Sequence, residues 1–413
     1  MNQPSAARNS KRIDSIDLLR GIVMVVMMLD HTRDFVHNAA LSFDPLDLTR
    51  TSVPLFFTRW ITHFCAPVFV FLAGTGTYLQ LARGKSRREL SRFLITRGLW
   101  LIFLELTAVR LGASFNLTDY RFFGMLQVIW VIGLSMILLA ALIHLPLKVV
   151  GAFGILMIAL HNLLDPLQVA ALRGPATAVP GLAAKLWIIL HQPFNAFPIL
   201  GWPSPVVLVV YPVIPWVGVM AAGYAFGSLY QNEAVLRRRR LLWIGGISTA
   251  VFVLLRAINI YGDPSRWSAQ KNTVFTFLSF LNTTKYPPSL LYLLMTLGPA
   301  IIALVWFERT SLRGWLGKLR NALVTFGRVP LFFYLLQWPT AHTISLLLHL
   351  AFGKPVGWLF QTPLDWGSQP AGIGFNLAVV YASWLAGVLL LYPLCRWFAA
   401  VKQRRRDWWL TYL

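Results

Sequence analysis

About ten long apolar segments run through the 413-residue sequence, each long enough to cross the roughly 30 Å hydrocarbon layer of a membrane as a helix. They are centred near residues 26, 69, 102, 133, 155, 217, 251, 298, 336 and 383. An eleventh, around residues 357–366, is shorter and more polar. Backbone amides inside a membrane have no water to bond, so such segments fold as helices. The sequence therefore predicts an all-α polytopic transmembrane bundle of about ten spans, or eleven, with residues 1–413 forming one domain.

The overall composition excludes a soluble domain and argues against binding to nucleic acid. Apolar residues make up 57% of the chain, charged residues 13%, and the mean hydropathy is +0.61. The net charge of +22 comes from short clusters of Lys and Arg between the apolar segments, and these clusters do not form one basic domain. Cys65 and Cys395 lie far apart in apolar segments, so neither a disulfide framework nor a thiolate metal site is expected.

Lysine and arginine alternate in abundance from one loop to the next. Along the predicted spans, roughly 22 of them fall on one side of the membrane and roughly eight on the other. Positively charged loops remain in the cytoplasm, so both termini are predicted to be cytoplasmic, with tails at residues 1–12 and 402–413.

The first span, within residues 12–34, carries polar groups at two depths. At about 100° per residue, one stripe of its helix holds Asp17, Arg20 and His31. Eleven residue steps separate Arg20 from His31, roughly 17 Å, so His31 falls near the membrane midplane if Arg20 lies at the boundary. Intramembrane ionisable groups are costly and mark functional sites. Two interpretations stay open: a proton-transfer or nucleophilic group lining a cavity, or a histidine paired off inside the bundle.

Two other spans carry ionisable groups at helical spacing. Arg59 and His63 lie four residues apart on one face of span two, so an acidic neighbour is implied. Glu105 shares a face of span three with Arg97. A buried carboxylate needs a positive neighbour, and His31, Arg59 or Arg97 is expected to provide it.

Common catalytic and metal-binding motifs are absent from the sequence. It has no P-loop, dinucleotide fingerprint, HExxH or GxSxG, which argues against an ATPase, a Rossmann enzyme, a zincin or an ordinary serine hydrolase. Asp30, His31 and Asp34 could bind a cation, but adjacent residues on a helix point in different directions. No metal is therefore expected.

The outward loops are the longer ones and contain turn-forming and aromatic residues. Residues 165–203 are predicted to form a short amphipathic or re-entrant piece with His191 at its rim, and residues 262–289 are similar. They form either a lid or recognition surface, or ordered loops that cap the bundle. In span six, Pro212 and Pro215 are expected to kink the helix where the bundle opens around a cavity.

Long phrases of the sequence resemble a known family. They are RIDSIDLLRG in the first span, THFCAPVFVFLAG in the second, YPVIPWVGVMAAGYAFG in the sixth, FLNTTKYPPSLLYLLMTLGP at the eighth and FGRVPLFFYLLQ in the ninth. These phrases resemble the bacterial branch of the heparan-alpha-glucosaminide N-acetyltransferase catalytic family over nearly the whole chain. The resemblance implies a multi-helix enzyme of the bacterial inner membrane that takes an acetyl group from cytoplasmic acetyl-CoA and delivers it to a sugar or glycan on the outer face.

The first span is also similar to the membrane acyltransferase-3 enzymes. Their pattern of Asp, two residues, Arg, and a His eleven positions later corresponds to Asp17, Arg20 and His31. The resemblance implies that this His takes part in acyl transfer. The eukaryotic glucosaminide enzymes have an asparagine where His31 falls, which favours chemistry of the acyltransferase-3 kind. Gln337 stands where this branch is expected to have a histidine, so no catalytic role is assigned to it.

The leading hypothesis is a membrane acyltransferase in which His31 acts as general base on an acceptor hydroxyl or amine, or transiently carries the acyl group. An imidazole titrates near neutrality, so it can accept and return a proton. Asp30 or Glu105 is expected to orient the imidazole or stabilise its charge. The candidate catalytic residues are His31, Asp30, Glu105 and His63.

A basic group at the inner end is expected to bind coenzyme A, because arginine forms bidentate contacts with phosphate. The candidate residues are Asp17, Arg20, Arg92 and Arg97, with residues 85–88 beside them. The alternative for this group is membrane topology and contact with anionic lipids.

A rival hypothesis from another class is a transporter or lipid-handling protein that uses the same polar interior as a solute path. A membrane scaffold is a third, but it leaves Asp17, Arg20, His31 and Glu105 without a role. The sequence does not identify the acceptor, the acyl chain, the choice between O- and N-acylation, or the oligomeric state, for which a homodimer is one alternative.

Overall fold

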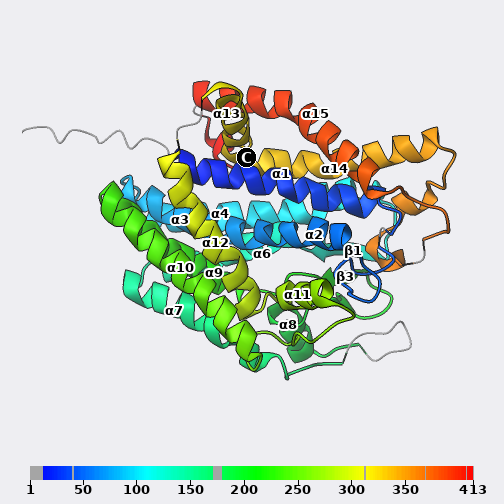
Figure 1. The fold of residues 1–413 in the computed structure, drawn as a ribbon, viewed down its shortest axis with the longest axis horizontal. Helices are drawn as coiled ribbons and strands as arrows, with labels where there is room; N and C mark the ends of the chain where they lie inside the picture. Colours follow the sequence, from blue (N-terminus) through cyan, green and yellow to red (C-terminus); the bar gives the residue numbers. More distant parts are fainter. Residues whose placement is uncertain are drawn as a thin grey trace, which may run out of the picture.

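The computed structural model describes residues 13–39, 41–170, 179–310, 313–367, 369–405 and 407–412. The predicted cytoplasmic tail at residues 1–12 lies outside these ranges. The longer helices run roughly alongside one another, with the strands and the short helices α8 and α11 toward the end of the bundle away from the start of α1 (Figure 1).

All ten predicted span centres fall inside helices. These helices are α1 (Asp14–Val36), α3 (Cys65–Ala82), α4 (Arg87–Leu104), α6 (Val128–Leu142), α7 (Leu147–Leu160), α9 (Trp216–Gly227), α10 (Ala234–Ile258), α12 (Leu290–Arg309), α14 (Pro330–Ala351) and α15 (Leu377–Arg404).

Six helical segments of the described chain are long and apolar enough to cross a membrane. They are Val53–Ala82, Leu147–Leu164, Ala234–Ile258, Leu290–Arg309, Pro330–Ala351 and Leu377–Arg404. These segments indicate an integral membrane protein. The total of about ten spans and the cytoplasmic placement of the termini stay predictions.

Shorter helices complete the helical part of the structure. They are α2 (Val53–Trp60), α5 (Arg110–Ser114), α8 (Leu182–Leu190), α11 (Thr273–Leu281) and α13 (Gly314–Arg328), with single turns η1 (Ile61–Phe64), η2 (Glu105–Val109), η3 (His161–Leu164), η4 (Ser228–Gln231), η5 (Gly357–Phe360), η6 (Pro363–Asp365) and η7 (Trp408–Thr411). The turn η2 is π-helical and joins α4 to α5, so a wide turn interrupts the third predicted span.

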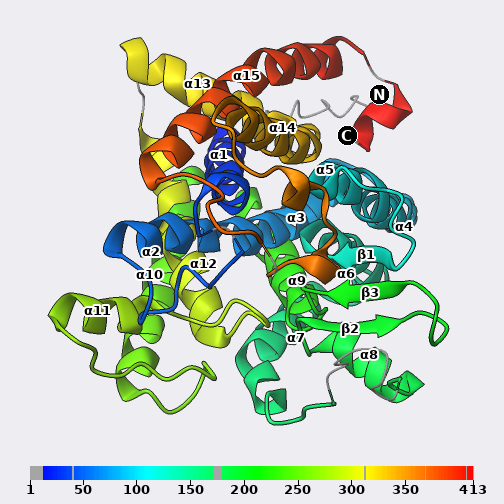
Figure 2. The same ribbon diagram turned by 90° about the vertical axis from the view of Figure 1, so that its right-hand side faces the viewer.

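Helix α1 lies at the centre of one half of the bundle, beside α14 and between α13 and α3 (Figures 1 and 2). Each helix contributes one glycine to the crossing of α1 and α13, and the backbone of each glycine lies against the other helix. A Cβ on Gly21 would lie 1.8 Å from the Leu323 carbonyl oxygen, and one on Gly327 would lie 1.8 Å from that of Asp17. Only glycine permits this approach, so the two glycines set the position of α1 against α13.

Small residues also join α3 to α9. A Cβ on Gly74 would lie 2.0 Å from the Met220 carbonyl oxygen, and Thr75 Oγ1 donates a 3.0 Å hydrogen bond to the Gly223 carbonyl. The run of small residues in span two therefore packs against a neighbouring helix, while Gly76 of the same run faces a cavity near the Arg20 side chain.

A small sheet corrects the all-α prediction. Strand β3 (Val206–Val209) pairs in parallel with β1 (Phe122–Leu126) and antiparallel with β2 (Asn195–Pro198), giving the order β1-β3-β2 (Figure 2). The apolar run that holds β3 continues directly into α9, so hydropathy alone does not separate strand from span. The strands satisfy one another's backbone groups, which the irregular ends of the bundle otherwise leave unpaired.

The predicted kink in span six is also wrong. Pro212 and Pro215 lie between β3 and α9, and Pro215 is the residue before the first turn of the helix. A proline lacks the amide hydrogen that a helix interior needs, and it is tolerated where a helix begins. The prolines therefore set where α9 begins, while Tyr211 just before them lines a cavity.

The two long segments predicted to face outward contain short helices and a strand, and buried polar contacts hold the second one. Residues 165–203 contain α8 and β2, and residues 262–289 contain α11. Arg256 at the end of α10 is 1% exposed and donates hydrogen bonds of 2.6–3.0 Å to four carbonyl oxygens of residues 265–282. One guanidinium thus organises the second segment without a carboxylate partner in these bonds.

Candidate functional site

A basic cavity of about 510 Å³ opens beside the first half of α1. We call it the basic cavity, and its cationic lining residues are Arg20, Arg83, Lys85, Arg97, Arg328 and Lys402. Among the described lining residues, Asp17 is the one carboxylate. Deeper in, the lining is mainly apolar and includes Met24, Phe69, Leu101 and Met136. The cavity therefore has a cationic mouth and an apolar interior.

Arg20 is held in place by contacts on both of its sides. Its Nη2 donates a 2.7 Å hydrogen bond to the Leu72 carbonyl, and its Nη1 lies 3.9 Å from Asp17 Oδ1. The neighbouring Gly76 has no side chain, which leaves room for the guanidinium. The geometry presents Arg20 as a fixed charge on the cavity wall.

Three of the four residues predicted to bind the donor line this cavity. Asp17, Arg20 and Arg97 are in its wall, whereas Arg92 is exposed and is outside the lining. The Arg97 guanidinium donates to the Thr411 carbonyl, which brings the C-terminal turn η7 to the cavity rim. The sequence around Arg97 does not predict this contact, because its partner lies at the other end of the chain.

A second cavity of about 430 Å³ contains His31, and we call it the histidine cavity. The His31 ring is partly exposed and stacks on Trp338, with ring centroids 3.8 Å apart and planes 26° apart. Its Nδ1 is buried without a hydrogen-bond partner among the described residues. Trp338, which the sequence analysis did not identify, therefore fixes the plane of the imidazole.

Next to His31, buried charges form an ion-pair cluster. The Asp30 carboxylate pairs with Arg59 and lies 2.9 Å from Arg33 Nη1, and Arg33 Nη2 also bonds Asp34 at 2.5 Å. Asp30 is thus the acidic neighbour that the position of Arg59 implied. Its carboxylate is engaged by the two arginines, and no hydrogen bond to the His31 ring is seen within the described part of the chain.

His63 lies in the packed core. Its ring is 0% exposed, faces Tyr292 at a centroid distance of 5.1 Å, and has no hydrogen-bond partner on either nitrogen among described residues. Its carbonyl accepts a 2.7 Å hydrogen bond from the Tyr292 hydroxyl. Its catalytic role stays a prediction, and the lining of neither cavity includes it.

Glu105 has a different partner from the predicted cation. Its Oε2 accepts hydrogen bonds from the backbone amides of Ile129 at 3.1 Å and Trp130 at 3.0 Å. These amides are in the first turn of α6, where the helix has unpaired donors and the positive end of its dipole. The helix terminus therefore compensates the buried carboxylate, and Glu105 fixes the start of α6.

A thin layer of side chains separates the two cavities. Met27 of α1 and Val128 of α6 line both of them. On α14, Tyr334 lines the basic cavity and Trp338, one turn later, lines the histidine cavity. Met27 lies four residues before His31, so about 6 Å of helix rise separates a residue shared by the two cavities from the imidazole.

Both long segments, residues 165–203 and 262–289, contribute to the wall of the histidine cavity. Phe194 comes from residues 165–203, and Lys285 and Tyr286 come from residues 262–289. Burial works to raise the pKa of Tyr286, but the Lys285 and Arg59 cations outweigh it and hold that pKa below its ordinary value. The segments therefore surround the cavity with aromatic and charged groups.

Comparison with known proteins agrees with this arrangement. The model of the family described as heparan-alpha-glucosaminide N-acetyltransferase, catalytic, matches residues 12–258, which include α1, the contact of α3 with α9, and Glu105. A search of curated proteins finds no match. The matched region covers more than half of the chain and implies an acetyltransferase. Because this match covers more than half of the chain, the protein belongs to the heparan-alpha-glucosaminide N-acetyltransferase catalytic family.

Proposed function

We propose that this protein is a transmembrane acetyltransferase that binds acetyl-CoA in the basic cavity and transfers the acetyl group to a sugar or glycan in the histidine cavity. The observation that carries the proposal is the shared wall: Met27 and Val128 line both cavities, and Met27 lies about one turn of α1 before His31. A donor and an acceptor that approach from opposite sides would meet there.

The basic cavity suits coenzyme A in both charge and shape. The donor carries several phosphate charges at one end and an uncharged arm with the thioester at the other. The six cations of the mouth offer charge-assisted hydrogen bonds to the phosphates. The apolar interior, which ends at Met24 and Met27, accepts the arm and directs the thioester toward α14 and His31.

His31 has two chemical routes to the product. As a general base, it takes the proton of the acceptor hydroxyl or amine while the acceptor oxygen or nitrogen attacks the thioester carbonyl, and it then returns the proton to the departing thiolate. As a nucleophile, its nitrogen first displaces the thiol to form an acetyl-imidazole, which the acceptor then attacks. Both routes yield free coenzyme A and an ester or amide.

The histidine cavity suits a carbohydrate. Sugars present hydroxyls to polar groups and apolar faces to aromatic rings, and this lining supplies both. The aromatic residues are Phe35, Phe43, Phe194, Tyr211, Tyr286, Trp338 and Trp366, and charged residues that include Asp34, Arg59 and Lys285 lie among them. The walls made by the two outward segments would choose the acceptor.

The proposed orientation follows the distribution of charge. The basic cavity is surrounded by the lysines and arginines that the positive-inside rule assigns to the cytoplasm. Acetyl-CoA would then enter from the cytoplasm, and the acceptor would bind on the outer face of the bacterial inner membrane, in contact with its lipids.

The test uses the full chain in proteoliposomes with acetyl-CoA labelled in the acetyl group. Glucosamine oligosaccharides supply an amine acceptor, and a cell-envelope glycan extract supplies hydroxyls. We expect label to move to one acceptor class with wild type and with His144→Ala, an exposed histidine control, and not with His31→Ala. Label that stays on the donor in all mixtures, together with no coenzyme A binding by calorimetry and with solute accumulation, would favour a transporter instead.

A further inference from the structure

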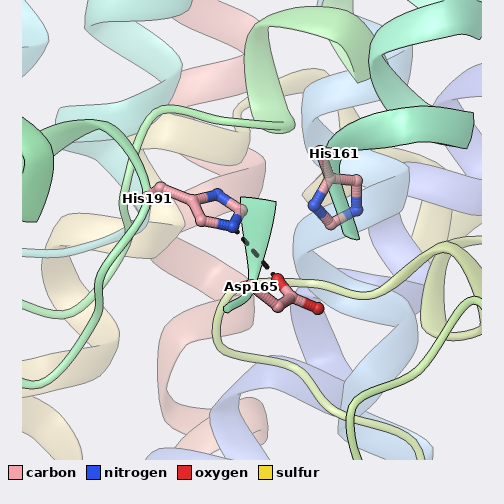
Figure 3. Close-up of side chains that lie close together, drawn as sticks. All are labelled: His161, Asp165 and His191. Atoms are coloured by element: carbon pink, nitrogen blue, oxygen red, sulfur yellow. Dashed lines mark hydrogen bonds and ion pairs between the residues drawn. The ribbon is translucent and has the colours of Figure 1, made fainter. Parts of the chain in front are cut away.

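Three potential metal ligands meet at the end of α7, outside the lining of both cavities. His161 and Asp165 come from the turn η3 and the residue after it, and His191 follows α8 (Figure 3). One ligand atom from each residue lies within 4.8 Å of the other two. His191 Nε2 and Asp165 Oδ1 are 3.0 Å apart. Figure 3 shows the two imidazoles on either side of the carboxylate.

The His161 ring is the observation that points to a missing ligand. It is 3% exposed, and neither ring nitrogen has a hydrogen-bond partner among the described residues. A neutral imidazole always offers one N–H donor and one acceptor, so a buried ring without partners leaves two polar atoms unsatisfied. His191, 2% exposed, likewise has no partner for Nδ1 in the described structure.

The carboxylate at the centre is held from behind. Asn162 Nδ2 donates a 2.8 Å hydrogen bond to Asp165 Oδ2, and the Leu290 amide at the start of α12 donates a 2.9 Å hydrogen bond to Asn162 Oδ1. Such outer contacts orient the ligands of metal sites and leave the other carboxylate oxygen for the ion. The Asp165 side chain is 20% exposed, which gives an ion a route from solvent.

We propose that His161, Asp165 and His191 bind a divalent transition-metal ion of the Zn²⁺ class. Two nitrogens and one carboxylate oxygen form a donor set that Zn²⁺ prefers, with a fourth position for water. Ligand atoms around tetrahedral Zn²⁺ lie roughly 3.3 Å apart, given bonds of about 2.0–2.2 Å. The His191–Asp165 separation of 3.0 Å is close to this value. The other ligand atoms are at most 4.8 Å apart, so side-chain movement has to shorten the widest separation by no more than about 1.5 Å.

Binding changes the tautomer of His191. The ion takes the place of the hydrogen between His191 Nε2 and Asp165 Oδ1, and in the neutral ring that hydrogen moves to Nδ1. Protons compete with the metal for the imidazole nitrogens and the carboxylate, so metal affinity falls as the medium becomes more acidic.

The ion would clamp one wall of the histidine cavity. His191 lies three residues before Phe194, which lines that cavity, and Gln192 makes two 2.8 Å hydrogen bonds with the backbone of Val169. The metal joins the end of α7 to this segment, so its role is to hold the segment in place, and no step of acetyl transfer passes through it.

The experiment uses the full chain in detergent, stripped with EDTA and then titrated with Co²⁺. We expect one equivalent to bind, with the visible absorption of tetrahedral Co²⁺, and Zn²⁺ to displace it. His161→Gln and Asp165→Asn should each weaken binding by at least about tenfold. The exposed His144→Gln should bind like wild type.

Two results would overturn the proposal. One is no saturable binding of Co²⁺ or Zn²⁺ by the wild-type chain, and the other is undiminished affinity in both ligand variants. Should a variant fail to fold, the wild type decides alone: Zn²⁺ must raise its Tm more than Mg²⁺ does, and equal effects contradict the site. These measurements do not involve acetyl transfer, so they stand apart from the proposed function.

Discussion

His31 is distinguished at the scale of single residues by what surrounds it. Its ring stacks on Trp338 and lines a cavity, whereas the buried histidine His63 faces Tyr292 in the core. The same residue type thus occupies two environments, and only the first gives a substrate access to the imidazole. The neighbouring Asp30 forms ion pairs with Arg33 and Arg59 and contributes charge to the cavity wall.

Replacing His31 with Gln tests this distinction. We expect kcat for acetyl transfer to fall by about 10²–10⁴, the usual contribution of a general base, while KM for acetyl-CoA changes little. Thermal unfolding should stay near that of wild type, because the ring makes no hydrogen bond through Nδ1. His144→Gln serves as the control, and a His31→Gln enzyme with full kcat would contradict the proposed role.

Helix ends and helix crossings place the residues of the site at the scale of elements. Glu105 holds the first turn of α6, whose residue Val128 separates the cavities. Gly21 and Gly327 hold α1 against α13. Gly327 and Ile129, whose amide donates to Glu105, also line the basic cavity, so both devices help to set the distance between the two cavities.

Glu105→Gln is expected to lower the free energy of unfolding by about 1–3 kcal/mol, because the buried helix start loses a charged hydrogen-bond acceptor. Glu89→Gln is the matched control, since Glu89 caps α4 from an exposed position through the Ser86 amide. Its effect should be much smaller. Thermal or denaturant unfolding in detergent measures both, and equal effects would show that burial of the cap does not matter.

Gly21→Ala is expected to separate α1 from α13 and to reduce both stability and activity. The added methyl would lie 1.8 Å from the Leu323 carbonyl oxygen, so the backbone of α13 would have to move away. Gly246→Ala in α10 meets nothing within 4 Å and should be neutral or stabilising, because alanine favours a helix by roughly 0.5–1 kcal/mol over glycine. Yield of folded protein and Tm distinguish them, and similar values would rule out a tight crossing.

The two cavities give the whole molecule a polarity, with cations on one side of a thin partition and aromatic and charged groups on the other. Charge gathered from α1, α4, α13, α15 and residues 83–85 after α3 would attract an anionic donor over several ångströms. This attraction belongs to the assembled cavity and not to any one helix.

Arg20→Gln and Arg83→Gln are expected to raise KM for acetyl-CoA by about tenfold each, with kcat less affected, because each removes a charged contact to phosphate. Arg92→Gln is the matched control, since Arg92 is exposed outside the cavity lining. Higher salt should raise the wild-type KM as well. A KM that responds equally to all three variants would point to general surface charge.

Hydropathy, read along the chain, located a helix at every predicted span centre. The resemblance of long sequence phrases identified the family. They also identified Arg20 and Arg97 as residues that now line one cavity, and His31 as a residue that lines another. These properties are local: an apolar run in a membrane forms a helix, and an ionisable group within it marks a candidate site.

Tertiary structure alone decided which groups meet. It paired Asp30 with Arg59, turned Glu105 into a helix cap, formed the sheet from three separated strands, and placed His161 beside His191 across 30 residues. Spacing along one helix cannot reveal such partners, because each depends on how distant segments cross. The sequence by itself determined the apolar helices and their polar residues, and packing determined the pairs, since contact energies are realised only between surfaces that folding brings together.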